Sequence, residues 1–206
     1  MLLVAGEYQV NLPVPFVPGS EFAGVVTEVA RDVVRPRVGD RVFGTTMAGS
    51  FGTEIVVPAE TVRVVPTGID DRAAAAFGVA HRTAYHVLRS VACLQPGEEL
   101  VVLGAGGGVG LAAVQIGALM GATVTAVASS AIKLDAAVPD DVRRNEEELI
   151  GLLAGGYVTP HVGAVFALEQ AAAALRYVAD GRAVGKVVLD VCVSQWPDSA
   201  GTTAST

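Results

Sequence analysis

A glycine-rich run at residues 104–110 constrains the fold of this chain more than any other feature of its sequence. The run follows residues 100–103, four apolar residues typical of a buried strand, and precedes an Ala/Leu/Val helix expected to begin near Leu111. Gly121 ends that helix, and residues 123–128 form a second β-prone stretch. This order predicts a βαβ unit, whose right-handed crossover makes the two strands parallel.

Glycines between a strand and a helix suit the binding of a dinucleotide. They allow a tight turn and let a pyrophosphate approach the backbone without meeting a Cβ atom. The unpaired N–H groups and the dipole of the helix N-terminus then favour the negative charge. A Walker-type loop is disfavoured because no Lys-Ser or Lys-Thr follows the last glycine, and a purely steric glycine turn is the remaining alternative. The candidate cofactor-binding residues of the loop are Gly104, Ala105, Gly106, Gly107, Gly108, Val109 and Gly110.

The end of the second strand distinguishes NADPH from NADH. An NAD site usually has an Asp or Glu there, which binds the ribose 2′-hydroxyl. This chain has Ser129, Ser130 and Lys133 instead, whose hydroxyls and positive charge can bind a 2′-phosphate. NADPH is therefore the expected cofactor, although Asp135 lies a little further on. An ordinary solvated lysine at a helix start is the alternative interpretation of Lys133.

The rest of the chain predicts an α/β protein with a β-rich first part. Short runs of β-prone residues broken by turns and prolines are typical of a small barrel or sandwich. The expected strands lie at 22–29, in the turn and strand at 38–44, and at 54–58 and 62–66. Helices are expected at 71–77, 80–91 and 169–178, a helix start within 139–148, and a last strand at 186–191.

Charge and hydropathy exclude two classes of partner. The formal net charge is -7 and no segment gathers Lys and Arg, so a nucleic acid would be repelled. The apolar runs are strand-sized, well short of the roughly 20 residues that span a bilayer, so no membrane partner is expected. The first residues lack a basic region and meet Glu7 at once, unlike a signal peptide. The expected compartment is the cytoplasm.

Cysteines and histidines offer no metal site or catalytic triad. Cys93 and Cys192 are too few for a disulfide framework, and neither belongs to a CxxC pair. His81 and His86 are five residues apart, which puts them on different faces of a helix. No serine lies in a G-x-S-x-G motif. These two histidines and His161 are expected to be structural or surface residues.

Several motifs together resemble the medium-chain dehydrogenase/reductase superfamily, specifically its zinc-free NADPH:quinone oxidoreductase branch. The resemblance rests on the glycine run and on residues 17–24, 38–42, 80–85, 160–162 and 183–189. It implies a GroES-like catalytic domain made from both chain ends with a Rossmann domain inserted between them. The implied boundaries are 1–90 and 151–192 for the catalytic domain and 91–150 for a partial Rossmann domain, with 193–206 a disordered tail.

The resemblance also implies the chemistry of the site. Zinc-dependent members carry a His before the Glu of a Gly-His-Glu motif, whereas this chain has Gly19-Ser20-Glu21 and lacks the four-cysteine structural-zinc lobe, so no metal is expected. Without zinc, the family transfers hydride from the nicotinamide to a quinone or an enoyl carbon. Thr83 is then expected near the nicotinamide. Tyr8 is expected to line the substrate site and donate a proton, or alternatively to be an aromatic residue packed at the cleft wall.

Two departures from the family change the functional expectation. The family's first strands have no counterpart before Met1, and only two of about six Rossmann strands are found. The missing second half also carries the edge strand of the family's homodimer, so that dimer is not expected here. The remaining sheet should expose an apolar edge and face. We expect weak or no turnover, and the alternatives are a non-catalytic dinucleotide-binding or interaction module and a remnant without a stable fold.

Overall fold

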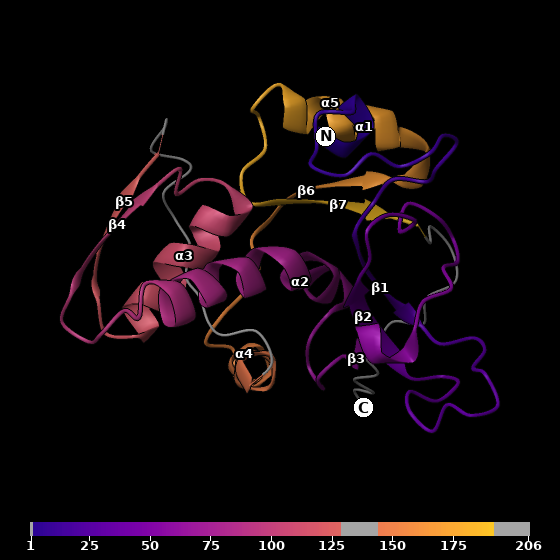
Figure 1. Ribbon diagram of the computed structural model, residues 1–206, viewed down its shortest axis with the longest axis horizontal. Coiled ribbons are helices and arrows are strands. Elements are labelled where there is room, and N and C mark those ends of the chain that lie inside the picture. Colours follow the sequence, from indigo (N-terminus) through magenta and orange to yellow (C-terminus); the bar gives the residue numbers. More distant parts are fainter. Residues whose placement is uncertain (1, 129–143, 192–206) are drawn as a thin grey trace, which may run out of the picture.

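Residues 2–128 and 144–191 are described by the computed structural model of the protein, and they form three small sheets around one long helix (Figure 1). The helices are α1 (Leu2–Ala5), α2 (Asp71–His86), α3 (Gly108–Leu119), α4 (Arg144–Ala154) and α5 (Ala171–Ala179). The strands are β1 (Glu21–Val25), β2 (Arg41–Thr45), β3 (Val62–Val64), β4 (Glu99–Leu103), β5 (Thr123–Val127), β6 (Val162–Ala167) and β7 (Lys186–Asp190). This architecture confirms the predicted α/β class.

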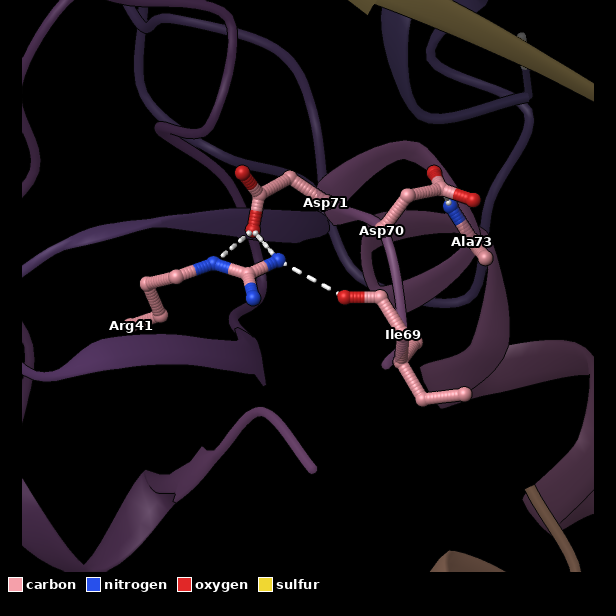
Figure 2. Close-up of polar contacts among 5 residues, drawn as sticks. All are labelled: Arg41, Ile69, Asp70, Asp71 and Ala73. Carbon is pink, nitrogen blue, oxygen red and sulfur yellow. Dashed lines mark hydrogen bonds and ion pairs between the residues drawn. The ribbon is translucent and has the colours of Figure 1, made fainter. Parts of the chain in front are cut away.

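Helix α2 runs through the middle of the molecule, between the β1–β3 sheet at one end and α3 at the other (Figure 1). Asp70 caps it, because its side chain accepts a hydrogen bond of 2.9 Å from the Ala73 backbone N–H. Arg41 on β2 reaches the same turn and donates to Asp71 Oδ1 at 2.7 and 3.0 Å and to the Ile69 carbonyl at 2.7 Å (Figure 2). These contacts attach the start of α2 to the sheet.

The first sheet is antiparallel and has the order β1-β2-β3. Its middle strand is the most buried, with Val42 and Phe43 in the core, and the Phe43 ring meets that of Phe77 on α2 edge to face at 5.9 Å. Gly78 allows this approach, because a Cβ atom there would lie 2.7 Å from Thr45 Cγ2. The expected β-rich first part is therefore confirmed for three of its four strands.

Strands β4 and β5 are parallel, with α3 between them in the chain, which confirms the predicted βαβ unit. Their register pairs Glu99 with Thr123 and Leu103 with Val127. Among the described residues this sheet has no third strand. One of its faces packs on α3, and the other exposes Val101, Val127 and Leu103, the last with 76% of its surface accessible. The expected uncovered apolar face is therefore present.

A second parallel pair, β6 and β7, is joined through α5. Helix α5 and strand β7 were expected from the sequence, whereas β6 was not, because the apolar run at 162–167 contains Gly163 and has no clear alternation. A Cβ atom at Gly163 would overlap the Val184 backbone, so the strand irregularity between Val162 and Ala164 requires glycine.

The core joins α2, α3 and α4. Leu149 and Leu153 of α4 and the following Val158 are almost fully buried, and they belong to one cluster with Ile116 of α3 and Tyr85 of α2. The Tyr85 hydroxyl also donates a hydrogen bond of 2.7 Å to Glu148 on α4. Helix α4 therefore covers the side of α2 and α3 that would otherwise expose this apolar surface.

Two sequence expectations were wrong. Residues 71–77 and 80–91 do not form separate helices: α2 is continuous to His86, and a turn of π-helix follows at Val87–Val91. Alanines on both sides of Gly78 sustain the helix, and the buried positions 74, 77, 81, 84 and 85 share one face of it. Residues 54–58 are not a strand, because no described strand pairs with them and Val56 is fully exposed.

The proposed domain boundaries remain predictions. The expected tail at 193–206 and Cys192 lie outside the described residues, as do Ser129, Ser130, Lys133 and Asp135. In the part of the chain that the structure describes, none of the helices has the length and apolar character that crossing a membrane requires.

Replacing Asp70 with Ala tests the attachment of α2. The change removes the acceptor of the Ala73 N–H and should lower the free energy of unfolding by about 1 kcal/mol, measured by urea denaturation. Asp32→Ala is the matched control, because Asp32 is an exposed carboxylate in a turn outside any helix, and its effect should stay within about 0.5 kcal/mol. Equal losses in the two variants would contradict the capping role.

Candidate functional site

The glycine loop forms a tight turn between β4 and α3. Gly104 adopts a φ of 72°, in the left-handed region that favours glycine, and the Gly107 N–H donates back to its carbonyl at 3.0 Å. Ala105 is buried, and its N–H donates to the Val127 carbonyl at 3.0 Å, which holds the loop against β5. Helix α3 begins at Gly108, three residues earlier than the position expected from the sequence.

Two glycines of the loop are required for different physical reasons. A Cβ atom at Gly110 would overlap the Gly104 carbonyl oxygen and lie 2.8 Å from Ala105 Cα, so only glycine lets α3 pack on the loop. Gly107, the residue before α3, is exposed, and a Cβ atom there would meet nothing closer than 3.5 Å. Packing of the protein interior therefore does not require a glycine at position 107.

The N-terminus of α3 can bind an anion. The amide of Leu111 donates to the Gly107 carbonyl at 2.7 Å. The amides of Gly108, Val109 and Gly110 precede that bond in the first turn, where a helix has no carbonyl partner to offer them. The helix dipole adds positive potential at the same place, so this turn suits a phosphate group.

An ion pair lies beside this turn and links distant parts of the chain. Lys186, the first residue of β7, donates a hydrogen bond from Nζ to Glu21 Oε2 on β1. Glu21 Oε1 accepts a hydrogen bond of 2.7 Å from the Val79 N–H on α2. The Lys186 side chain passes Gly108, because a Cβ atom at Gly108 would lie 3.2 Å from Lys186 Cδ. No local sequence signal marks Glu21 or Lys186 as a site residue, although both lie in motifs that carry the family resemblance.

The C-terminal segment also contacts the loop directly. The Gly185 N–H donates to the Gly106 carbonyl at 3.3 Å, and Gly107 and Gly185 form a parallel bridge. Gly185 has a φ of 65°, and a Cβ atom there would overlap the His161 carbonyl oxygen, so glycine is required at this contact. Residues 161 and 185–186 thus form one wall beside the start of α3.

The two expected catalytic residues are both exposed. Tyr8 is in an irregular segment after α1 with 43% of its surface exposed, and Thr83 lies on an exposed face of α2. Within residues 2–128 and 144–191, no side-chain hydrogen bond joins either residue to the glycine loop. Their roles therefore remain predictions, as does the binding of a 2′-phosphate by Ser129, Ser130 and Lys133, which the described residues do not include.

Ser20 and the histidines lie in different environments. Ser20 is exposed, and the Thr46 N–H donates to its carbonyl at 2.8 Å. No group of three His, Cys, Asp or Glu side chains within the described ranges is arranged to hold a metal ion. His86 is exposed, whereas His81 is 3% exposed and stacks on Phe77 with ring centroids 4.9 Å apart.

Comparison with known proteins identifies the family. A model of the zinc-binding dehydrogenase family matches residues 59–189, and a model of the alcohol dehydrogenase GroES-like domain matches residues 1–67. The chain belongs to the medium-chain dehydrogenase/reductase superfamily. The resemblance of its motifs is thus confirmed, together with the combination of GroES-like and Rossmann-like parts.

Individual superfamily members resemble the chain over most of its length. Quinone oxidoreductase-like protein 2 of Bos taurus is 34% identical over 163 residues, which are 75% of this chain and 47% of the relative. The solved quinone oxidoreductase of Thermus thermophilus superposes with a TM-score of 0.75 and 26% identity, over 92% of this chain and 86% of that one. The JamJ enoyl reductase, at 19% identity, shares the fold with a TM-score of 0.76, over 92% and 86% of the two chains. The chain spans about half the length of its bovine relative.

Replacing Gly110 with Ala tests the packing of the loop on α3. The added methyl group overlaps the loop backbone and should lower the free energy of unfolding by roughly 1–3 kcal/mol, measured by urea denaturation. Gly151→Ala is the control, because Gly151 lies in α4 with open space around it, and alanine there should stabilise the helix by roughly 0.5–1 kcal/mol. An unchanged stability of the Gly110 variant would contradict this geometry.

Burial of His81 predicts an acid-sensitive fold. Burial lowers the pKa of His81 from 6.5 to about 4, and the positive charge of Lys186 acts in the same direction. The unfolded chain therefore takes up this proton at a higher pH than the folded chain. Stability from the neutral ring is complete above about pH 6.5 and falls as the pH drops toward 4, by at most about 1.4 kcal/mol per pH unit. Urea unfolding at a series of pH values should show a shallower slope for His81→Phe, and identical slopes would refute the prediction.

Proposed function

We propose that this chain derives from, and acts as, an NADPH-dependent reductase that transfers hydride to a quinone or an α,β-unsaturated carbonyl, including an enoyl thioester, without zinc. The first turn of α3 carries this proposal. Its leading amides have no carbonyl partner within the helix, and the superfamily of this chain is one of nicotinamide-dependent oxidoreductases. The open space beside Gly107, where a Cβ atom would meet only the Gly104 carbonyl oxygen at 3.5 Å, supports the binding of a dinucleotide there.

Bound NADPH supplies the hydride, and the protein holds its phosphates. In the proposal, the amides of Gly108, Val109 and Gly110 bind the pyrophosphate. Ser129, Ser130 and Lys133 bind the 2′-phosphate, because no carboxylate stands directly after β5 to repel it. The quinone oxidoreductase of Thermus thermophilus has been solved in complex with NADPH, which supports the same choice here.

The substrate side of the proposal rests on relatives and on two residues. The relatives are named quinone oxidoreductases and an enoyl reductase, whose substrates are electron-poor and carry a carbonyl oxygen. Tyr8 would donate a hydrogen bond or proton to that oxygen, and Thr83 would lie near the nicotinamide. Ser20 stands where zinc-dependent members carry histidine, so oxygen polarisation would come from hydrogen bonding alone.

A non-catalytic dinucleotide-binding module is the second candidate. It is favoured by the two-stranded sheet of β4 and β5, since the described residues contain no second half to support a nicotinamide. Efficient hydride transfer needs the reacting carbons held within about 3–3.5 Å. The same binding loop without that support would bind NADPH and turn over poorly.

Titration with NADPH and NADH, followed by calorimetry, tests the binding step. We expect saturable binding that prefers NADPH, and a Kd for Gly107→Ala at least about tenfold higher, because a methyl group occupies the phosphate position. The folded loop tolerates that methyl group, so the thermal midpoint should stay unchanged. Gly151→Ala is the control, with unaltered binding. If neither NADPH nor NADH binds, the proposal is refuted.

Turnover separates the two candidates. Consumption of NADPH with a quinone and with an enone, at saturating cofactor, should be measurable and reduced by Tyr8→Phe in the reductase. If the chain binds NADPH but does not consume it with either substrate, it is a non-catalytic binding module.

A further inference from the structure

Two segments without charged side chains lie next to each other beyond the paired part of β1 and β2. Residues 8–20 and 46–53 contain no Asp, Glu, Lys, Arg or His, although 17% of the chain is charged. The first segment leads into β1 and the second follows β2, and the Thr46 N–H donates to the Ser20 carbonyl at 2.8 Å. The two segments therefore continue the first sheet, and together they are called the uncharged ribbon.

The backbone of the uncharged ribbon is held in one conformation. The Gly49 N–H donates to the Val17 carbonyl at 2.8 Å, and the Phe51 N–H donates to the Pro18 carbonyl at 3.0 Å. Gly19 has a φ of 96°, and a Cβ atom there would overlap the Phe51 ring, so this close packing requires glycine. A surface on the ribbon is consequently formed before any ligand arrives.

Large apolar side chains of the ribbon are exposed to solvent. Val14, Val17 and Met47 have 83%, 49% and 51% of their surfaces accessible. Met47 lies in a turn that the Thr46 hydroxyl closes by donating to the Ala48 carbonyl at 3.0 Å. Single exposed apolar residues are ordinary, whereas several of them on a fixed segment without charge are typical of a surface that binds an apolar group.

The ribbon adjoins the region of the proposed reaction. Ser20 directly precedes Glu21, whose Oε1 accepts a hydrogen bond of 2.7 Å from the Val79 N–H on α2. Glu21 Oε2 accepts from Lys186 Nζ, and the Lys186 side chain passes Gly108 at the start of α3. One end of the ribbon is thus attached to the helix and the strand that border the glycine loop.

We propose that Val17 and Met47 form an apolar subsite that binds the hydrocarbon substituent of the acceptor and so determines which quinones or enones the chain prefers. This subsite rests on the proposed reductase function. A hydrocarbon chain placed on the ribbon removes apolar surface from water on both sides. A charged substituent would lose hydration and meet no opposite charge on the ribbon, so acceptors with a charged substituent are disfavoured.

Methyl NMR of the protein labelled with ¹³C at the methionine methyl groups tests the subsite without turnover. Met47→Leu assigns the Met47 signal, and Met120, half-buried at the end of α3, is the internal control. With NADP⁺ present, duroquinone is compared with its analogue in which one methyl group is replaced by hexyl. We expect the analogue to shift the Met47 signal saturably and to leave the Met120 signal unchanged. An unmoved Met47 signal would overturn the proposal.

Steady-state kinetics with the same two quinones test the specificity. In the wild type, KM should be about tenfold lower for the hexyl analogue than for duroquinone. Val17→Asp places a charge beside the hydrocarbon chain and should reduce this preference to about twofold or less. Val34→Asp is the matched control, because Val34 is an exposed valine outside the ribbon, and it should keep the preference. Equal preferences in the two variants would contradict the subsite.

The two measurements separate this proposal from the function on which it rests. The KM ratio compares two acceptors on one protein sample, so it does not depend on the fraction of the variant that folds. If neither quinone is reduced but the hexyl analogue still shifts the Met47 signal, the reductase function fails and the subsite stands. If both quinones are reduced with equal KM, the reductase function stands and the subsite fails.

Discussion

The packing of α2 supports the rest of the described structure. This one helix contacts β1, β2, α3, α4, β6 and β7, so the sheets are held in place largely through it (Figure 1). Its start is determined by the Asp70 cap and by Arg41, which binds Asp71 and the chain before it (Figure 2). Small residues on its surface, Gly78 toward β2 and Ala80 toward Gly108 of α3, let its neighbours approach closely. A glycine loop without this helix would have no rigid base.

The pair of Glu21 and Lys186 links both ends of the chain at the glycine loop. Their side chains are 14% and 21% exposed, and Glu21 also accepts from the Val79 N–H of α2. Such a pair contributes little net stability, since the loss of hydration offsets most of the attraction. Its geometric effect is larger, because it holds β1, α2 and β7 beside the start of α3.

The sheet of β4 and β5 has only two strands among the described residues, and one of its faces is exposed to solvent. Val101, Leu103 and Val127 contact solvent, whereas α4 covers the apolar surface of α2 and α3. The exposed face reaches the glycine loop, because Leu103 directly precedes Gly104 and the Val127 carbonyl accepts from the Ala105 N–H.

The sequence by itself determined the elements whose signals are local. Glycine at 104–110 between an apolar strand and an Ala-rich helix predicted the βαβ unit, and the prolines and glycines before Asp70 predicted most of the first sheet. The sequence wrongly predicted a break in α2 at Gly78 and did not predict β6. The continuity of α2 and the pairing of β6 both depend on the residues that pack against them. Only the tertiary structure decided which residues surround the loop. It brings together residues that are far apart in the sequence, namely Glu21, His81, Gln115 and Lys186. No local sequence pattern predicts these contacts, because they depend on long-range packing.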